Sequence, residues 1–124
     1  MTTLPTTKAL GDAEARALDH LSAAGLVLVR RNYRVARGPS SRGGEVDLVM
    51  RDVDGTIVFV EVRARRDSRF GGAAASIGAA KRQSLVFAAS HFLRGMPSPP
   101  PCRFDVVAVD GDRIEWLPAA FDAG

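Results

Sequence analysis

The fold is decided by residues 43–65, which are GGEVDLVMRDVDGTIVFVEVRAR. The runs 45–51 and 56–63 are rich in β-branched and other apolar residues, which predicts two strands. Between them, residues 53–55 have the pattern of a three-residue hairpin turn with Gly55 in the left-handed conformation. Such a turn fixes the register in which the two strands pair.

The two faces of this predicted hairpin differ in chemistry, because side chains alternate along a strand. The odd-numbered face is apolar near the turn and charged at its far end. There the register places Asp47 opposite Glu61 and Glu45 opposite Arg63, with Cβ atoms about 4.5 to 5.5 Å apart. The even-numbered side chains are all apolar and predict a face packed on a core: Val46, Leu48, Met50, Val58, Val60 and Val62.

The charged end of the hairpin has two interpretations. Two opposed carboxylates repel each other unless something offsets the repulsion, and a divalent cation does so best. Mg²⁺ prefers one or two carboxylates together with waters and substrate phosphates. Arg63 could neutralise the carboxylates instead, which would make the cluster structural.

The rest of the chain predicts two helices and three further strands. The element order αβββαββ indicates a single α/β or α+β domain with a mixed central sheet over residues 9–121, after a flexible tail at 1–8. The remaining predicted elements are helices at 12–24, closed by Gly25, and at 76–94, with Ser76 as N-cap, and strands at 26–35, 103–109 and 113–117.

Composition excludes several classes of protein. The 124 residues are 46% hydrophobic and 25% charged, as expected for one globular domain with a core. The apolar runs are far shorter than the about 20 residues of a transmembrane helix, and the first residues do not resemble a secretory signal. A single cysteine, Cys102, excludes an internal disulfide and a Cys/His zinc site, and it fits a cytoplasmic location.

Positive charge is concentrated in the middle of the chain. The net charge is +3, but residues 30–82 contain 12 basic and 6 acidic residues. A local excess of this kind indicates a polyanionic partner.

Each predicted helix carries one charged residue on its apolar face. Glu14 lies one turn before Leu18, and Lys81 lies one turn before Leu85. A charge that faces a core is costly unless it is paired or functional. Either side chain alone could reach solvent, but the two together, on the helices that flank the acidic hairpin end, favour convergence on one site.

Four blocks of sequence resemble one family. The blocks are GDAEARAL at 11–18, the hairpin at 43–65, AAKRQSLVFAASHFL at 79–93 and CRFDVVAV at 102–109. Over residues 9–121 they closely resemble the YraN-type bacterial proteins. That family is similar to the PD-(D/E)XK nucleases, nearest to archaeal Holliday junction resolvases. The resemblance implies a restriction-endonuclease-like fold.

The resemblance also implies a set of metal ligands. Asp47 matches the aspartate of the superfamily motif, and Glu61 matches the glutamate of its Glu-x-Lys. Both would bind Mg²⁺ or Mn²⁺ together with the backbone carbonyl of Val62. Glu14 matches the helix glutamate of resolvase-like members. It would either contact these ligands without touching the metal or bind a second metal ion.

The sequence departs from the superfamily motif at Arg63, where the superfamily has lysine. Arginine is always charged and cannot act as a base, but it can stabilise phosphate charge. Lys81 could supply the missing ammonium from the helix. Arg63 and Lys81 would then stabilise the transition-state phosphate and orient water.

The function that these features and the resemblance together predict is metal-dependent hydrolysis of phosphodiester bonds in nucleic acid. The resemblance to Holliday junction resolvases implies branched or structured DNA as the substrate class. Arg42, Arg65, Arg66 and Arg69 would contact the nucleic-acid backbone. Resolvase-like relatives act as dimers, which implies a homodimer. The alternatives are a catalytically inactive nucleic-acid-binding protein, which Arg63 favours, and an adaptor for an acidic protein.

Other residues are expected to be structural. Cys102 is expected to be a small buried residue. Asp105 could point into the site, but an aspartate that faces solvent from an edge strand is the simpler interpretation. Trp116 is expected to pack on the core. Glu45 could be a metal ligand, although pairing with Arg63 across the strands explains it more simply.

Overall fold

The predicted order of elements, αβββαββ, is confirmed. The computed structural model describes residues 7–36, 38, 43–64 and 77–123, and among these the side chains from residue 11 onward. Its elements are α1 (Thr7–Ala23), β1 (Val27–Val35), β2 (Gly44–Arg51), β3 (Ile57–Ala64), α2 (Ala79–Arg94), β4 (Cys102–Asp110) and β5 (Arg113–Phe121).

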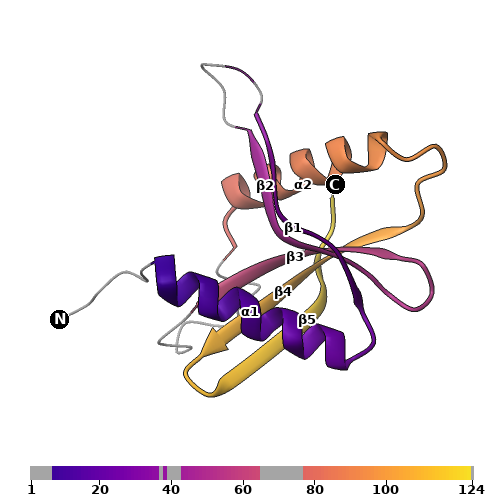
Figure 1. Cartoon of the computed structure of the whole chain (residues 1–124). Coiled ribbons are helices and arrows are strands. Elements are labelled where there is room, and N and C mark those ends of the chain that lie inside the picture. Colours follow the sequence, from indigo (N-terminus) through magenta and orange to yellow (C-terminus); the bar gives the residue numbers. More distant parts are fainter. Residues whose placement is uncertain (1–6, 37, 39–42, 65–76, 124) are drawn as a thin grey trace.

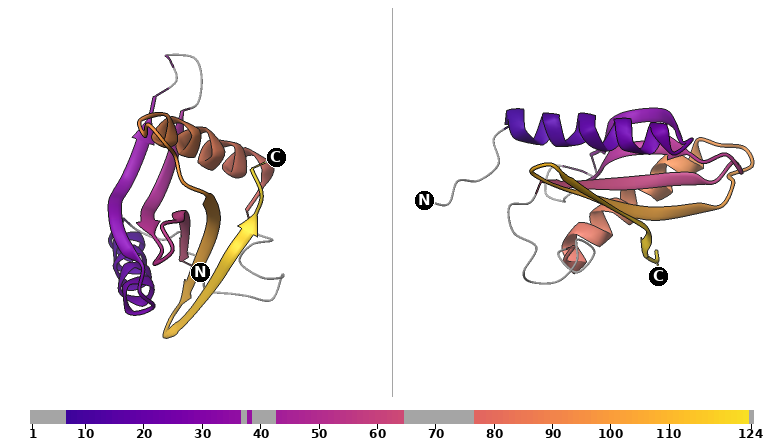
Figure 2. Two further views of the ribbon diagram at one scale, coloured as in Figure 1. Left: turned by 90° about the vertical axis from the view of Figure 1, so that its right-hand side faces the viewer. Right: turned by 90° about the horizontal axis from the view of Figure 1, so that it is seen from below.

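The strands form one five-stranded sheet in the order β1-β2-β3-β4-β5 (Figure 1). β3 and β4 are parallel and the other neighbours are antiparallel, so the predicted mixed sheet is confirmed. The chain crosses from β3 to β4 through α2, because parallel neighbours need a long connection. α1 covers one face of the sheet and α2 the other, which gives three layers (Figure 2).

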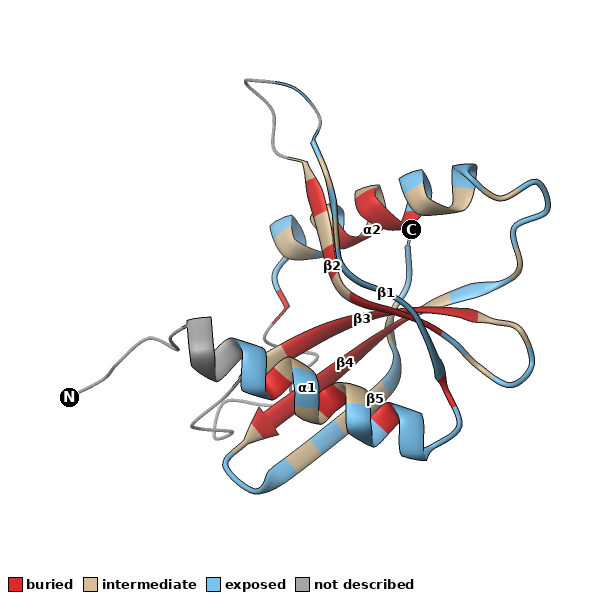
Figure 3. Cartoon of the chain, in the orientation of Figure 1, coloured by how far each residue is buried: buried red, intermediate tan, exposed pale blue. Residues whose placement is uncertain are grey.

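Apolar side chains fill the space between the sheet and each helix. Leu21 of α1 packs with Leu48 on one face, and Leu85 of α2 packs with Phe59 on the other. β3 is buried over most of its length (Figure 3). A strand that is covered on both faces needs apolar residues at odd and even positions alike, which explains the run at the start of β3.

The predicted hairpin is confirmed in its turn and in its register. The backbone N–H of Asp52 donates to the carbonyl of Thr56 at 2.9 Å, and Gly55 has a φ of 91°. Leu48 pairs with Val60, and the pairs between them and the turn follow the same register. In the described part of the chain this pairing ends at Leu48 and Val60. The strands therefore separate just where the charged residues begin.

One residue of the apolar face lies on the opposite side from the one predicted. Val46 packs in the α2 cluster, beside its β1 partner Tyr33. The β1–β2 pair bends along its length (Figure 1). In β1, Asn32 lies between the partners of Leu48 and Val46 and has a left-handed φ of 51°. Asparagine adopts this conformation more readily than most residues. The bend carries the end of β2 toward α2.

The start of α2 also differs from the prediction. Its N-cap is Gly78, in an extended conformation and without a side-chain capping bond, so the prediction of Ser76 is wrong. Ile77 is 2% exposed and packs with Val106 of β4, which holds the chain on the sheet until the helix begins. α1, in contrast, begins at Thr7, within the predicted tail.

β5 continues to Phe121, further than predicted, because Asp105 of β4 anchors its second half. The fully buried Asp105 carboxylate accepts hydrogen bonds from the Ala119 backbone N–H and from Trp116 Nε1, both at 2.9 Å, and from Arg103 Nε at 3.0 Å. The prediction that Asp105 faces solvent is wrong. β4 lies inside the sheet, not at its edge, because β5 covers it.

Two further expectations have opposite outcomes. Trp116 packs against the α1-face core, as predicted. Cys102 is exposed rather than buried, because it is the first residue of β4 and lies at the rim of the sheet. No helix in the described ranges is long and apolar enough to cross a membrane.

Gly44 sets the distance between β2 and α2, which gives a first testable prediction. A methyl group at this position would meet the backbone of α2 at Ser84 and Ala88. Gly44→Ala is therefore expected to destabilise the protein by about 1–3 kcal/mol, the usual cost of overpacking. Urea unfolding measures the effect. Gly11→Ala is the control, because Gly11 has open space around it in α1 and alanine favours helix. Equal stability of the two variants would contradict the close packing of α2 on β2.

Candidate active site

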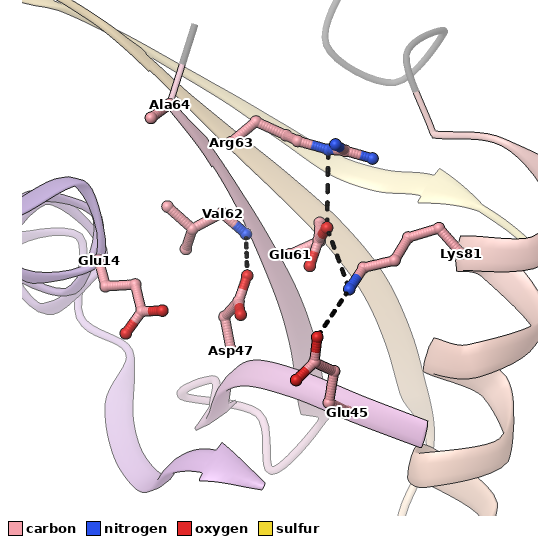
Figure 4. A pocket seen from close by; sticks show the side chains of 8 residues that line it. All are labelled: Glu14, Glu45, Asp47, Glu61, Val62, Arg63, Ala64 and Lys81. Atoms are coloured by element: carbon pink, nitrogen blue, oxygen red, sulfur yellow. Dashed lines mark hydrogen bonds and ion pairs between the residues drawn. The ribbon is translucent and has the colours of Figure 1, made fainter. Parts of the chain in front are cut away.

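A polar pocket of about 260 Å³ opens where β2 and β3 separate, between the two helices (Figure 4). The separation exposes the charged ends of both strands to a common space. Side chains from α1, β2, β3 and α2 reach it. The lining residues are Glu14, Glu45, Asp47, Glu61, Val62, Arg63, Ala64 and Lys81.

Asp47 is held in the pocket by the backbone of β3. Its Oδ2 accepts a hydrogen bond from the Val62 N–H at 2.8 Å. Asp47 is the next residue of β2 after the last pair, Leu48 with Val60. At this position a bond from the side chain takes the place of backbone pairing. This bond fixes one carboxylate oxygen and directs the carboxylate into the pocket beside Glu61 (Figure 4).

Glu61 is the most perturbed acidic residue of the site. It is 4% exposed, and among the described residues its buried Oε1 has no hydrogen-bond partner. Burial and, after it, the neighbouring Asp47 carboxylate raise the pKa of Glu61 to about 8, against the opposing effect of Lys81 and Arg63. A buried acceptor without a partner is costly, so this oxygen is suited to a proton or a cation.

Two cations contact Glu61 from opposite sides. Lys81 Nζ lies 3.6 Å and Arg63 Nε 3.6 Å from Glu61 Oε2. Lys81 also contacts Glu45 Oε1 at 3.3 Å, so the ammonium bridges two carboxylates (Figure 4). Lys81 therefore faces the acidic end of the hairpin, as the sequence predicted.

Glu14 enters the pocket from α1, which also agrees with the prediction. Its Oε2 lies 3.7 Å from Arg31 Nη2 of β1. Partial burial and then the charge of Asp47 raise the pKa of Glu14, while Arg31 opposes them. Two acidic residues of one pocket thus have raised pKa values for the same reasons, which is common at functional sites.

Glu45 has different neighbours from those predicted. It pairs across β1–β2 with Arg34, whose Nε lies 3.4 Å from Glu45 Oε2. The expected position opposite Arg63 does not arise, because the pairing of β2 with β3 ends before it. Lys81 and Arg34 are therefore cationic neighbours of Glu45.

The structure brings together six predicted site residues and leaves four outside its description. Arg42, Arg65, Arg66 and Arg69 lie outside the described residues. Two further cations, Arg31 and Arg34, were not predicted as site residues but contact acidic residues of the pocket. Cross-strand charge pairing between β1 and β2 could have indicated Arg34, which lies opposite Glu45. Arg31 lies opposite Leu48 and meets Glu14 of α1, so no such signal indicates it. The residues gathered in the pocket are Glu14, Asp47, Glu61, Val62, Arg63 and Lys81.

The donor set fits a hard divalent cation with water in its shell. In the part of the chain that is described, no three Asp, Glu, His or Cys side chains stand close enough to hold a metal between them. Mg²⁺ needs only one or two carboxylates and keeps several waters. Asp47 and the unpartnered oxygen of Glu61 meet that requirement.

Comparison with known proteins assigns the chain to a family. Residues 13–109 match the uncharacterised protein family UPF0102, so the protein belongs to this family. A UPF0102 protein of Paracidovorax citrulli is 63% identical over 120 residues, which are 96% of this chain and 87% of that one. One of Methylibium petroleiphilum is 63% identical over 119 residues, 95% of this chain and 98% of the other. One of Cupriavidus taiwanensis is 57% identical over 120 residues, again 96% and 87%.

Proposed function

We propose that this protein is a metal-dependent nuclease of the PD-(D/E)XK type, which hydrolyses phosphodiester bonds in DNA, with branched or structured DNA as the substrate class. The observation that carries the proposal is the pair formed by Asp47 and the buried Glu61, in a pocket that also holds Lys81 and Arg63. Within the described residues, Glu61 Oε1 has no hydrogen-bond partner. Carboxylates that bind a cation, next to side chains that bind an anion, suit phosphate ester hydrolysis.

Each residue of the pocket would have a distinct role. Asp47, Glu61 and the Val62 carbonyl would hold Mg²⁺ or Mn²⁺, which supplies an activated water and neutralises charge on the phosphate. Lys81 and Arg63 would bind the non-bridging oxygens and stabilise the charge that develops there. Arg63 is a permanent cation, so its part in this chemistry is electrostatic.

A second candidate function is nucleic-acid binding without cleavage. Arg63 stands where the superfamily motif has lysine, and this substitution favours the alternative. Such a protein would use the same cations to hold a phosphate. It would not need Asp47 to be charged, and this difference separates the two candidates by experiment.

The decisive test compares the wild type with Asp47→Asn. We expect cleavage of structured DNA in Mn²⁺ or Mg²⁺ by the wild type and a loss of at least about 100-fold in the variant. Mn²⁺ should raise the melting temperature of the wild type, because it binds only the folded state, and it should leave that of Asp47→Asn unchanged. Asparagine keeps an acceptor for the Val62 N–H, so the metal-free variant should be as stable as the wild type or slightly more so.

Asp112→Asn is the control for this test, because Asp112 is an exposed residue in the turn between β4 and β5. It should cleave and respond to Mn²⁺ as the wild type does. DNA binding without cleavage and without a metal response would support the second candidate. A wild type that neither cleaves nor binds nucleic acid would contradict both.

A further inference from the structure

A second hollow, of about 410 Å³, adjoins the pocket, and Glu45 lines both. It lies between the β1–β2 pair and α2, on the side of Glu45 away from Asp47. We call it the flanking groove. Its lining residues are Arg34, Val35, Ala36, Gly43, Gly44, Glu45 and Ser84.

The floor of the flanking groove is backbone rather than side chain. A Cβ at Gly43 would collide with the carbonyl of Val35, and one at Gly44 would collide with α2. Both positions therefore require glycine, because other backbone of the protein already occupies the space that a side chain would take.

Two polar side chains border this floor. Arg34 is exposed, with 76% of its side chain accessible, and it belongs to β1. Ser84 of α2 accepts a hydrogen bond from the Glu45 N–H at 3.3 Å, so its hydroxyl keeps a proton to donate. A guanidinium and a hydroxyl are among the groups that most often contact phosphate in nucleic-acid complexes.

Glu45 stands between the pocket and the groove and binds the cation of each. Its Oε1 contacts Lys81 at 3.3 Å on the pocket side, and its Oε2 contacts Arg34 at 3.4 Å on the groove side. The carboxylate is therefore an anion held by the two cations that a nucleic-acid strand would use. A strand that enters both hollows has to compete with it.

We infer that the flanking groove binds the phosphate next to the one in the pocket, so that a single nucleic-acid strand runs from Lys81 across Glu45 to Arg34 and Ser84. Glu45 occupies both cations when no strand is bound and weakens binding by competition. This inference rests on the proposed function, because it takes the ligand of the pocket to be a nucleic-acid phosphate.

The test measures binding of a fluorescent single-stranded oligonucleotide of about ten nucleotides by anisotropy, in EDTA and at several salt concentrations. Arg34→Ala should weaken binding about 5- to 10-fold and lower the salt dependence by about one phosphate contact. Arg51→Ala is the matched control, because Arg51 is an exposed arginine at the opposite end of the same β1–β2 pair. It should bind as the wild type does. Glu45→Gln should bind several-fold more tightly.

Three outcomes would overturn the inference, and they differ in what they say about the proposed function. Equal binding by Arg34→Ala and Arg51→Ala would remove the groove from the strand's path, while cleavage by the wild type would leave the proposed function intact. Weaker binding by Glu45→Gln would show that Glu45 is a ligand and not a competitor. No binding of DNA or RNA by any variant, together with no cleavage, would reject the groove and the proposed function alike.

Discussion

Arg103→Ala is expected to destabilise the fold by about 3–5 kcal/mol. The substitution leaves the carboxylate of Asp105 at the centre of the sheet without a charge partner, since Arg103 Nε is the cation at 3.0 Å from it. Removing one member of a buried ion pair costs this much because the other charge stays buried. Urea unfolding of both proteins at neutral pH measures the difference.

Asp52→Asn is the matched control for this prediction. Asp52 Oδ2 accepts a hydrogen bond from Nη1 of the same guanidinium at 2.8 Å. Asp52, however, lies in the turn after β2 and is partly exposed. A pair of this kind contributes less than about 1 kcal/mol. If the two variants lose equal stability, Arg103 acts through the turn and not through Asp105.

The stability of the metal-free protein is expected to fall as pH rises from about 5 to about 9. The pKa of Glu61 is about 8 in the folded protein, whereas a solvated glutamate has its ordinary value of 4.5. Between these values the folded state keeps a proton that the unfolded chain has released. The stabilisation is therefore complete at a pH below the pKa that Glu61 has in the unfolded chain. It is lost as pH rises through the pKa that Glu61 has in the folded protein. The slope is on the order of 1.4 kcal/mol per pH unit within this range.

Glu61→Gln should remove most of this slope and should be more stable than the wild type at pH 9. Glutamine has nearly the shape of the protonated acid and cannot ionise beside Asp47. Glu115→Gln serves as the control, because Glu115 is exposed on β5 and should keep the wild-type profile. Thermal unfolding from pH 5 to pH 9 provides the measurement. The same slope in Glu61→Gln as in the wild type would show that another group causes it.

The hairpin and the meeting of its carboxylates could be predicted because they follow from local pattern. A single glycine, Gly55, fixed the turn, and the alternation of side chains then placed Asp47 near Glu61. Glu14 and Lys81 could be added because a charge on an apolar helix face stands out against its neighbours. These inferences depend only on periodicity within one element.

The parts that the sequence analysis missed depend on how distant segments pair. The sequence around Asp105 indicates a solvent-facing residue, because nothing near it shows that β5 continues to Ala119, whose backbone N–H donates to the Asp105 carboxylate. Arg34 does not stand out in the sequence because its partner Glu45 belongs to the next strand, and the register between these strands shifts at an irregularity between Leu28 and Arg30. Contacts between elements are not encoded in the periodicity of either one.

The site residues come from segments that are near in sequence and from one that is distant, and this difference affects the order in which the site can assemble. Asp47 and Glu61 are joined by a tight hairpin, whereas Lys81 reaches them only through the long crossover between β3 and β4. Closing a short loop costs little chain entropy, and pairing parallel strands through a crossover is intrinsically slow. The like charges can therefore meet before Lys81 arrives to offset them. Protonation of Glu61 lowers the electrostatic work of that early step, so acidity bears on the kinetics of folding as well as on the equilibrium.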